Sequence, residues 1–279
     1  MNNYNKKAAL LKRFTALVII AMMSLGVFAS CSKNDDDVKT VKTFVLIHGA
    51  WQGAWVWQNV QAGLVAAGHK VIVVELPGHG EDKTPPATLN LNAYRDKVVA
   101  AINGVSGKVV LVGHSMGGMV ITSVAEVIPN KIEKLVYIGA FLPATGQSLG
   151  DLAGTDAQSL LGPNIIPSAD QLTLDIKRDQ VVNIFCQDGP ASVQAQVNAM
   201  FRVEPAIPFG DKVTITAANF GAVDKYYIHT LLDHAVGIDL QNRMAKAAGI
   251  TKQYNLNSGH CPFLSMPEQV TLTLLTITK

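Results

Sequence analysis

Ser115 lies in a setting that would expose its hydroxyl group for nucleophilic attack. The segment Gly113-His114-Ser115-Met116-Gly117 fits the pattern G-x-S-x-G, and it stands between the apolar run 108–112 and the helix-like run 119–127. A serine on so tight a strand-to-helix turn has a strained backbone, and a side chain at either flanking glycine would collide with the neighbouring strand or helix. The segment therefore predicts a nucleophile at Ser115, with an ordinary glycine-rich turn as the alternative.

A serine hydroxyl is a weak nucleophile at neutral pH, so this chemistry also needs a base and an acid that orients the base. His260 follows the last strand-like run and precedes the final helix-like run, and we predict that it is the base. Asp233, just after the run 225–230, is the predicted acid. Asp224 and Asp239 are the alternatives, because helix capping or solvation would also explain them.

Acyl transfer further requires N–H donors for the negative charge that develops on the carbonyl oxygen. One donor is expected from the residue after the nucleophile, Met116, and the other from the loop after the first strand, at Ala50. His48 and Gly49 lie in the same turn as Ala50, and His48 is expected to make a structural hydrogen bond there. Both donors would be backbone groups, so only the turn positions indicate them.

These residues need a common frame, and the hydrophobic pattern of the chain predicts one. Apolar, β-branched runs predict strands at 43–47, 70–76, 108–112, 132–138, 225–230 and 251–256. Helix-like runs between and after them predict helices at 54–67, 92–105, 116–128, 238–248 and 267–275. This alternation indicates an α/β fold with a mostly parallel sheet covered by helices on both faces. The predicted site residues follow strand ends, where parallel sheets hold their ligands.

The region of about 141–223 breaks this alternation. It is rich in Gly, Pro, Asn, Asp and Gln, with a helix-like patch at 192–201 and no clear strand. An insertion of this length between the strands near 138 and 225 is typical of a lid or a specificity region. Candidate walls of an apolar substrate pocket are Trp51, Phe141, Leu142, Phe185, Met200 and Phe201. Core packing would also explain each of these apolar residues.

Two more segments indicate a particular protein family. Residues 44–57 (FVLIHGAWQGAWVW) and 67–71 (AGHKV), followed by the turn at Ser115, resemble the α/β-hydrolase branch that holds plant methyl esterases, hydroxynitrile lyases and their bacterial esterase relatives. The resemblance covers residues 43–143 well and the region from 225 onward more loosely. It implies the α/β-hydrolase fold and ester hydrolysis by Ser115, Asp233 and His260, without a cofactor. This chain order of serine, acid and histidine is that of the fold.

The chain departs from the lyases of that branch at three positions. They are similar to this chain but carry threonine in place of Gly49, glutamate in place of His114, and lysine in place of Cys261. The lysine charge holds the departing cyanide, and Cys261 cannot supply it. Lyase activity is therefore not expected.

The first 30 residues have the layout of a secretory signal, with a basic start and an apolar core from about 14 to 28. The segment Val27-Phe28-Ala29-Ser30-Cys31 resembles a bacterial lipobox, which predicts lipidation at Cys31 and anchoring of an exported protein to a membrane. A plain cleaved signal or an uncleaved anchor is the alternative. Residues 31–41 are polar and acidic and predict a flexible tether, which leaves 42–279 as the hydrolase domain.

Composition narrows the remaining possibilities. The 279-residue chain is 48% hydrophobic and 16% charged, and its formal net charge is +2. Four basic and no acidic residues lie within 1–30, so the rest of the chain has a net charge of −2. No basic patch indicates nucleic acid, and no metal site is predicted. Cys186 and Cys261 are predicted to be buried thiols, although they could pair in an oxidising compartment.

Together these observations predict a serine hydrolase that cleaves a carboxylic ester of a small or medium apolar substrate through an acyl-enzyme. The expected partners are the ester substrate and, through Cys31, a membrane. A thioesterase, an amidase or a lipase would share the same catalytic residues. A non-catalytic binding protein on this fold is a further alternative, because fold alone does not determine function.

Overall fold

The structure is a computed structural model that describes residues 40–279, and residues 41–279 form one compact unit. The predicted signal peptide, the lipidation site Cys31 and nearly all of the tether lie outside the described residues. Within residues 40–279, none of the helices combines the length and apolar character needed to cross a membrane.

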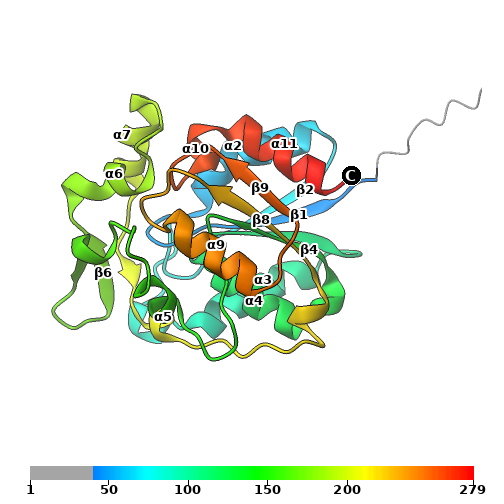
Figure 1. Cartoon of the computed structure of the whole chain (residues 1–279), viewed down its shortest axis with the longest axis horizontal. Helices are drawn as coiled ribbons and strands as arrows, with labels where there is room; N and C mark the ends of the chain where they lie inside the picture. The colour runs from blue at the N-terminus through cyan, green and yellow to red at the C-terminus, as the bar shows by residue number, and fades with distance from the viewer. Residues whose placement is uncertain (1–39) are drawn as a thin grey trace, which may run out of the picture. The chain divides into compact units, whose positions relative to one another are not determined.

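The described chain is built on six parallel strands in the order β2-β1-β3-β4-β8-β9 (Figure 1). Their bounds are β1 (Thr43–Ile47), β2 (Lys70–Val74), β3 (Val109–His114), β4 (Ile132–Ile138), β8 (Asp224–Thr230) and β9 (Gln253–Leu256). Every residue of β3 is buried, as expected for a central parallel strand with both faces covered. The predicted parallel α/β sheet is confirmed.

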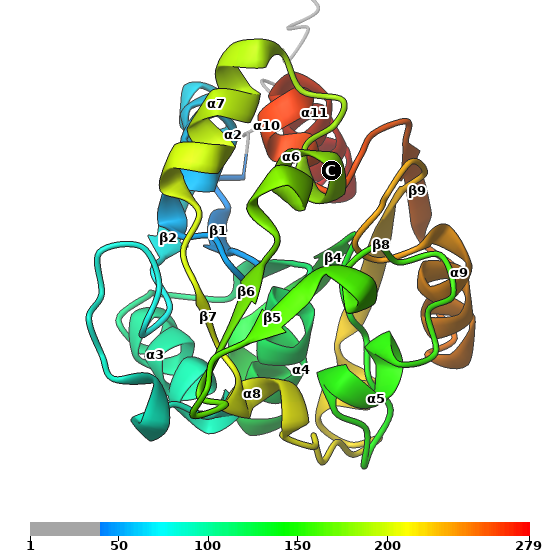
Figure 2. The same cartoon turned by 90° about the vertical axis from the view of Figure 1, so that its left-hand side faces the viewer.

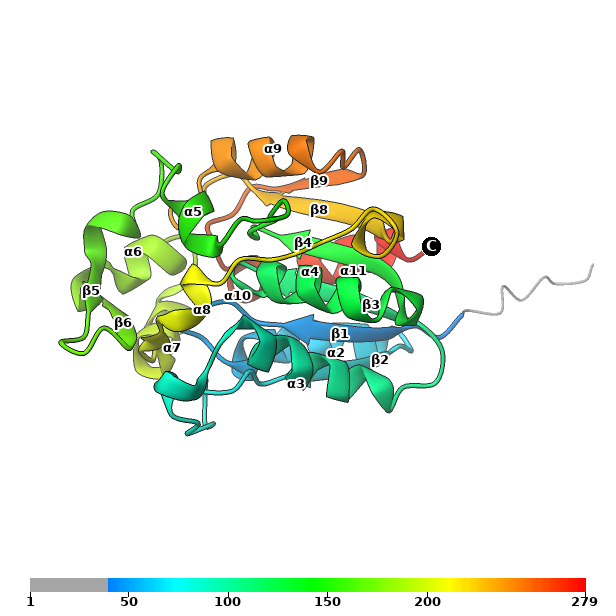
Figure 3. The same ribbon diagram turned by 90° about the horizontal axis from the view of Figure 1, so that it is seen from below.

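Helices cover both faces of this sheet. The pair α2 and α11 lies on one face and the pair α3 and α4 on the other (Figures 1 and 3). Their bounds are α2 (Gln58–Ala66), α3 (Leu91–Asn103), α4 (Gly117–Val127) and α11 (Pro267–Ile277), with α9 (Ile238–Ala247) against β8 and the short α10 (Pro262–Ser265) before α11. Local signals set some of these ends: the Asn90 side chain accepts from the Ala93 N–H at 2.9 Å and caps α3.

The strand order places the loops after β1 and β3 side by side. The chain moves outward from β1 to β2 and then returns to the other side of β1 with β3, and Ile47 pairs with Gly113. Such a reversal of strand order opens a crevice at the carboxyl ends of the strands. The turn at Ala50 and the turn at Ser115 therefore border the same crevice.

An insertion between β4 and β8 lies over that edge of the sheet, as Figure 2 shows in front view. It contains α5 (Leu149–Ala153), α6 (Val181–Phe185), α7 (Ala191–Met200), α8 (Ile207–Gly210) and a small antiparallel sheet of β5 (Ile165–Pro167), β6 (Thr173–Ile176) and β7 (Glu204–Pro205). The prediction that this region has no strand is wrong. These strands have two to four residues, too few to show the alternating pattern of a longer strand.

Candidate active site

Ser115 occupies a left-handed backbone conformation, with φ of 53° and 5% of its surface exposed. The N–H groups of Gly118 and Phe141 both donate to the Ser115 carbonyl oxygen at 3.0 Å and hold the turn. A Cβ atom added at Gly117 would lie 2.8 Å from the His48 carbonyl oxygen, and one at Gly113 would lie 2.7 Å from the Gly117 carbonyl oxygen. The sequence predicted this crowding on both sides of Ser115.

His260 and Asp233 form a buried pair at the same edge of the sheet. The distance from His260 Nδ1 to Asp233 Oδ2 is 2.8 Å, and the two side chains are 1% and 0% exposed. Since an ionised carboxylate only accepts hydrogen bonds, Nδ1 carries the proton and Nε2 is left as the basic nitrogen. The carboxylate thus selects the tautomer that a base requires.

The Asp233 carboxylate is held by several further donors. The N–H groups of Ala235 and Val236 donate to Oδ1 at 2.8 Å, and the Thr230 hydroxyl donates to Oδ2 at 2.7 Å. The alternative acids lie elsewhere. Asp224 starts β8 at the opposite edge of the sheet and pairs with Lys252, and Asp239 lies in the first turn of α9.

His114, directly before Ser115, supports the loop that carries His260. Its Nε2–H donates to the His260 carbonyl oxygen at 2.8 Å, and the centroids of the two rings are 4.4 Å apart. Burial lowers the pKa of His114 well below its usual value, so this ring is neutral. The chain neighbours of Ser115 and the histidine loop are thus in direct contact.

The predicted oxyanion donors line the crevice. Ala50 and Met116 border the same cavity as Ser115, and no hydrogen bond among residues 40–279 uses either backbone N–H. The Leu76 N–H donates to His48 Nε2 at 3.1 Å, so His48 Nδ1 carries the proton and donates to the Gly49 carbonyl oxygen at 2.8 Å. Because a trans peptide points its C=O and N–H in opposite directions, this bond turns the Ala50 N–H away from His48. The structural hydrogen bond predicted for His48 is confirmed.

A cavity of about 500 Å³ opens beside Ser115. Of the predicted walls, Trp51 and Phe141 line it, whereas Leu142 lines a separate cavity next to α9. Phe185 and Phe201 pack against the Trp51 ring at centroid distances of 5.6 and 6.4 Å. Further walls come from the insertion and include Leu149, Leu161, Ile165 and Phe209, which were not predicted.

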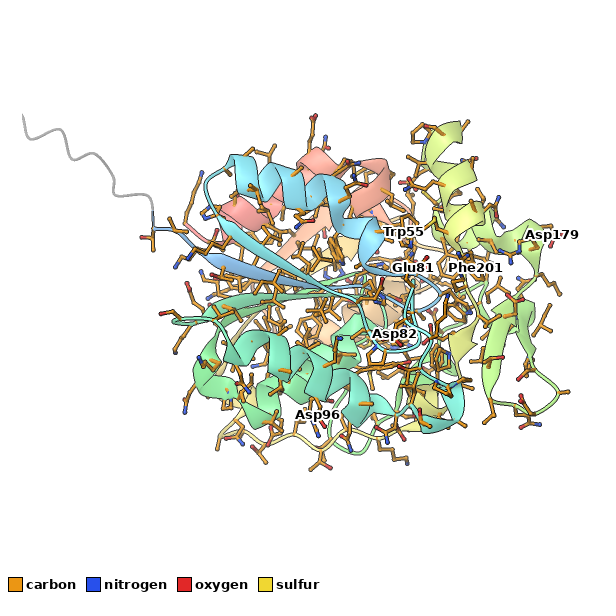
Figure 4. The ribbon with its side chains drawn as sticks, turned by 180° about the vertical axis from the view of Figure 1, so that it is seen from behind. Trp55, Glu81, Asp82, Asp96, Asp179 and Phe201 are labelled. Carbon is orange, nitrogen blue, oxygen red and sulfur yellow. The ribbon has the colours of Figure 1, made fainter. Side chains whose placement is uncertain are left out.

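Phe201 marks where the insertion meets the core, while Asp179 projects from the outer edge of the insertion (Figure 4). Met200, the last residue of α7, was also predicted as a wall but is not among the residues that line the cavity.

Four residues with direct contacts to the loops that carry the predicted site residues escaped the prediction. Glu204 and His79 pair at 2.8 Å, and Glu204 also accepts from the Trp51 N–H next to Ala50. Gln187 Nε2 donates to the Leu232 carbonyl oxygen at 2.7 Å, and Asp188 Oδ2 accepts from the Gly259 N–H at 2.8 Å. Their partners are distant in sequence, so no spacing pattern could have indicated them.

The two cysteines within residues 40–279 are free and buried. Burial raises the pKa of Cys186 to about 12 and the pKa of Cys261 well above its usual value, so neither is a thiolate at neutral pH. Within residues 40–279 no three His, Cys, Asp or Glu side chains are grouped to hold a metal ion.

Comparison with known proteins gives a consistent result. The model of the family described as alpha/beta hydrolase family matches residues 44–271. The provisionally named chloroplastic methylesterase 11 of Arabidopsis thaliana is 30% identical over an alignment of 265 residues that covers 88% of this chain and 65% of that protein. The chain thus spans less than two thirds of the length of the first relatives it matches.

Two other matches are similar over nearly their whole length. The alpha-hydroxynitrile lyase of Arabidopsis thaliana is 26% identical, covering 81% of this chain and 93% of that protein. Among solved structures, polyneuridine aldehyde esterase superposes with a TM-score of 0.78 at 22% identity, covering 86% of this chain and all of that one. The structural match supports the fold.

Proposed function

The chain belongs to the alpha/beta hydrolase family, and from this premise we propose that it hydrolyses a carboxylic ester with Ser115 as the nucleophile. The observation that carries the proposal is the buried hydrogen bond between His260 and Asp233, at the sheet edge where Ser115 occupies its strained turn. Methylesterases and esterases among the relatives support ester hydrolysis as the reaction.

In the first half of the proposed reaction, Ser115 Oγ attacks the ester carbonyl carbon while His260 Nε2 takes the hydroxyl proton. The carbonyl oxygen becomes negatively charged and accepts hydrogen bonds from the Ala50 and Met116 N–H groups. Asp233 stabilises the imidazolium that forms. When the intermediate collapses, His260 returns the proton to the departing alcohol, which leaves an acyl group on Ser115.

The second half repeats these steps with water. His260 Nε2 takes a proton from a water molecule, whose oxygen attacks the acyl carbon. The same two N–H groups hold the second oxyanion, and the proton then returns to Ser115 as the carboxylic acid leaves. The amino end of α4 begins directly after Met116, and its dipole adds to the positive potential at the oxyanion.

The cavity supports a small or medium, uncharged and apolar substrate. Its walls are mainly apolar, and Asp156 is the only ionisable side chain among the described residues that line it. The Asp156 carboxylate already accepts from the N–H groups of Gly237 and Gln158, at 2.7 and 3.1 Å. No cationic side chain from residues 40–279 lines the cavity to bind an acidic substrate.

Labelling with a fluorophosphonate probe tests the nucleophile. We expect the native chain to be labelled and Ser115→Ala to remain unlabelled, and equal labelling of both would exclude Ser115. Turnover of p-nitrophenyl esters of graded chain length, compared with amides and thioesters, then separates an esterase from an amidase, a thioesterase or a lipase.

We also propose that the chain is exported and anchored through a lipid on Cys31. The support is the lipobox-like segment before Cys31 and the polar tether after it. Cell fractionation of the native chain and Cys31→Ala tests this, because only the native chain should remain with the membrane.

A further inference from the structure

Glu204 lies in the insertion, at the start of β7, yet its side chain reaches the turn that carries Ala50. Its Oε2 accepts from the Trp51 N–H at 2.7 Å and from His79 Nε2 at 2.8 Å. The carboxylate is fully buried, and a buried charge is tolerated only where it is paired and hydrogen-bonded. Both partners are therefore integral to its place in the core.

His79 supplies the compensating charge. Its Nδ1 lies 3.0 Å from the Pro77 carbonyl oxygen and its Nε2 lies 2.8 Å from the Glu204 carboxylate. Both neighbours only accept hydrogen bonds, so both ring nitrogens carry a proton and the ring is positively charged. Burial opposes this charge, but the attraction of Glu204 and the hydrogen bonds outweigh it, and the pKa of His79 is raised.

The contacts of this turn surround the Ala50 N–H on both sides. His48 donates to the Gly49 carbonyl oxygen, which belongs to the same peptide group as the Ala50 N–H. Glu204 accepts from the Trp51 N–H, which belongs to the next peptide group. The Arg202 N–H donates to the Trp51 carbonyl oxygen at 3.2 Å, and Trp51 Nε1 donates to the Leu174 carbonyl oxygen at 2.9 Å.

Trp51 needs this support because its backbone is unfavourable by itself. Its φ is 59°, in the left-handed region that bulky side chains rarely adopt. Such a conformation persists only where the surroundings hold it in place. Without the Glu204 carboxylate, the buried Trp51 N–H would lose its acceptor, and the turn would be free to rotate the Ala50 N–H out of the crevice.

We propose that Glu204 is a positioning residue for the oxyanion hole: it fixes the Trp51 peptide so that the Ala50 N–H points at the reacting carbonyl oxygen. The inference rests on the proposed ester hydrolysis. It means that the insertion contributes to the chemical step as well as to the shape of the cavity.

The test compares Glu204→Gln with Asp211→Asn. Asp211 is a matched control, since it is also an insertion carboxylate that accepts from a core backbone N–H, at Leu91, but it lies away from the Ala50 turn. In Glu204→Gln, His79 loses the charge that keeps it doubly protonated, and its remaining proton stays on Nδ1 against the Pro77 carbonyl oxygen. Its Nε2 then needs a donor, whereas the Trp51 N–H still needs an acceptor, and the single amide atom in the place of Oε2 cannot serve both. Since losing one oxyanion donor lowers kcat by about 10² to 10³, we expect misplacement to lower kcat by about 10- to 100-fold, with KM within about twofold.

The second measurement is the Ki of an alkyl trifluoromethyl ketone, which a residue with a purely structural role would leave unchanged. This probe adds the serine oxygen to form a hemiketal whose oxyanion occupies the hole, so its Ki should rise by the same factor by which kcat/KM falls. Asp211→Asn should leave both quantities within about twofold. Fluorophosphonate titration counts the folded active sites, and all rates are expressed per site.

Unchanged kcat per site and unchanged Ki in Glu204→Gln would overturn the proposal. If that variant does not fold, Glu204→Asp keeps the charge opposite His79 but withdraws the oxygen from the Trp51 N–H, and the same losses are expected from it. Native kcat per site in Glu204→Asp would equally overturn the proposal. Failure of the proposed function is distinguishable, because the native chain itself would then resist the fluorophosphonate.

Discussion

At the scale of single residues, hydrogen bonds distinguish Asp233 from the other aspartates that were considered as the acid. Asp233 accepts four hydrogen bonds from neighbouring groups and a fifth from His260, whereas Asp224 lies at the opposite end of β8. Asp233→Asn would present an amide to His260 and favour the wrong tautomer. We expect kcat to fall by about 10⁴-fold with little loss of fold, measured as ester turnover beside far-ultraviolet circular dichroism.

The control for this prediction is Asp239→Asn, which changes an exposed carboxylate at the start of α9. Its turnover should match that of the native chain. Native turnover in Asp233→Asn, or a large loss of turnover in Asp239→Asn, would assign the role of the acid to another residue.

The buried charge of His79 predicts a pH dependence of stability. The groups that face it are Glu204 from the insertion, Glu75 after β2, the neutral His48 ring at 4.9 Å and the Tyr94 ring of α3 at 5.4 Å. Because the pKa of His79 is raised in the folded state, its contribution is complete below about pH 6.5, the value in the unfolded chain. The contribution is lost as the pH rises through the folded-state pKa.

Urea unfolding at a series of pH values between 6 and 9 measures this effect. The free energy of unfolding should decrease with rising pH in the native chain, and the decrease should be smaller in His79→Gln. Parallel curves for the two proteins would contradict the assignment of the charge to His79.

At the scale of elements, the turn after β1 and the turn after β3 are packed so closely that Gly49 has no room for a side chain. A Cβ atom there would lie 2.7 Å from Ser115 Cβ and 2.8 Å from His114 Nδ1. Overpacking of this kind costs about 1–3 kcal/mol of stability. We expect Gly49→Ala to lose that amount in urea unfolding and to lose more than tenfold in kcat, because Ser115 must shift.

Gly104→Ala provides the comparison, since nothing lies within 4 Å of its added Cβ and its φ of −75° suits alanine. Its stability and turnover should be unchanged or slightly improved. Native activity in Gly49→Ala would show that the two turns leave room for a methyl group at this position.

The sequence predicts elements well where hydrophobic periodicity is long. Strand β4 has the predicted bounds, and the bounds of α4 and α9 differ from prediction by one residue at most at each end. The carboxyl ends of parallel strands lie at one edge of the sheet. The sequence alone therefore predicted that Ser115, Asp233 and His260 lie at the same edge. The acid remained ambiguous among three aspartates, because only the folded loop shows which one reaches His260.

The insertion was less predictable for physical reasons. Its strands are too short for periodicity, and its irregular composition carries no local signal for pairing. Glu204 is 153 residues from Trp51 and 125 from His79, so their contact depends on how the whole chain folds. Residues that support a catalytic loop from a distant segment leave no motif in the sequence.

At the scale of the whole molecule, the buried thiols report on global unfolding. Cys186 lies in the insertion and Cys261 beside His260, and both are free. In Cys31→Ala, we expect no rapid reaction with Ellman's reagent in the native state and reaction of both thiols after unfolding. A peptide containing Cys186 joined to Cys261 under non-reducing conditions would contradict the free thiols.

One segment of the chain thus carries both the shape of the cavity and the support of the turn beside it. Leu149, Ile165 and Phe209 line the cavity, and Glu204 reaches Trp51 from the same insertion. A chimera that exchanges residues 141–223 for those of another esterase would remove that carboxylate together with the old cavity. Under the proposed role of Glu204, such an exchange would change the substrate range and the catalytic rate together, and point changes that leave β7 in place would be the way to alter specificity alone.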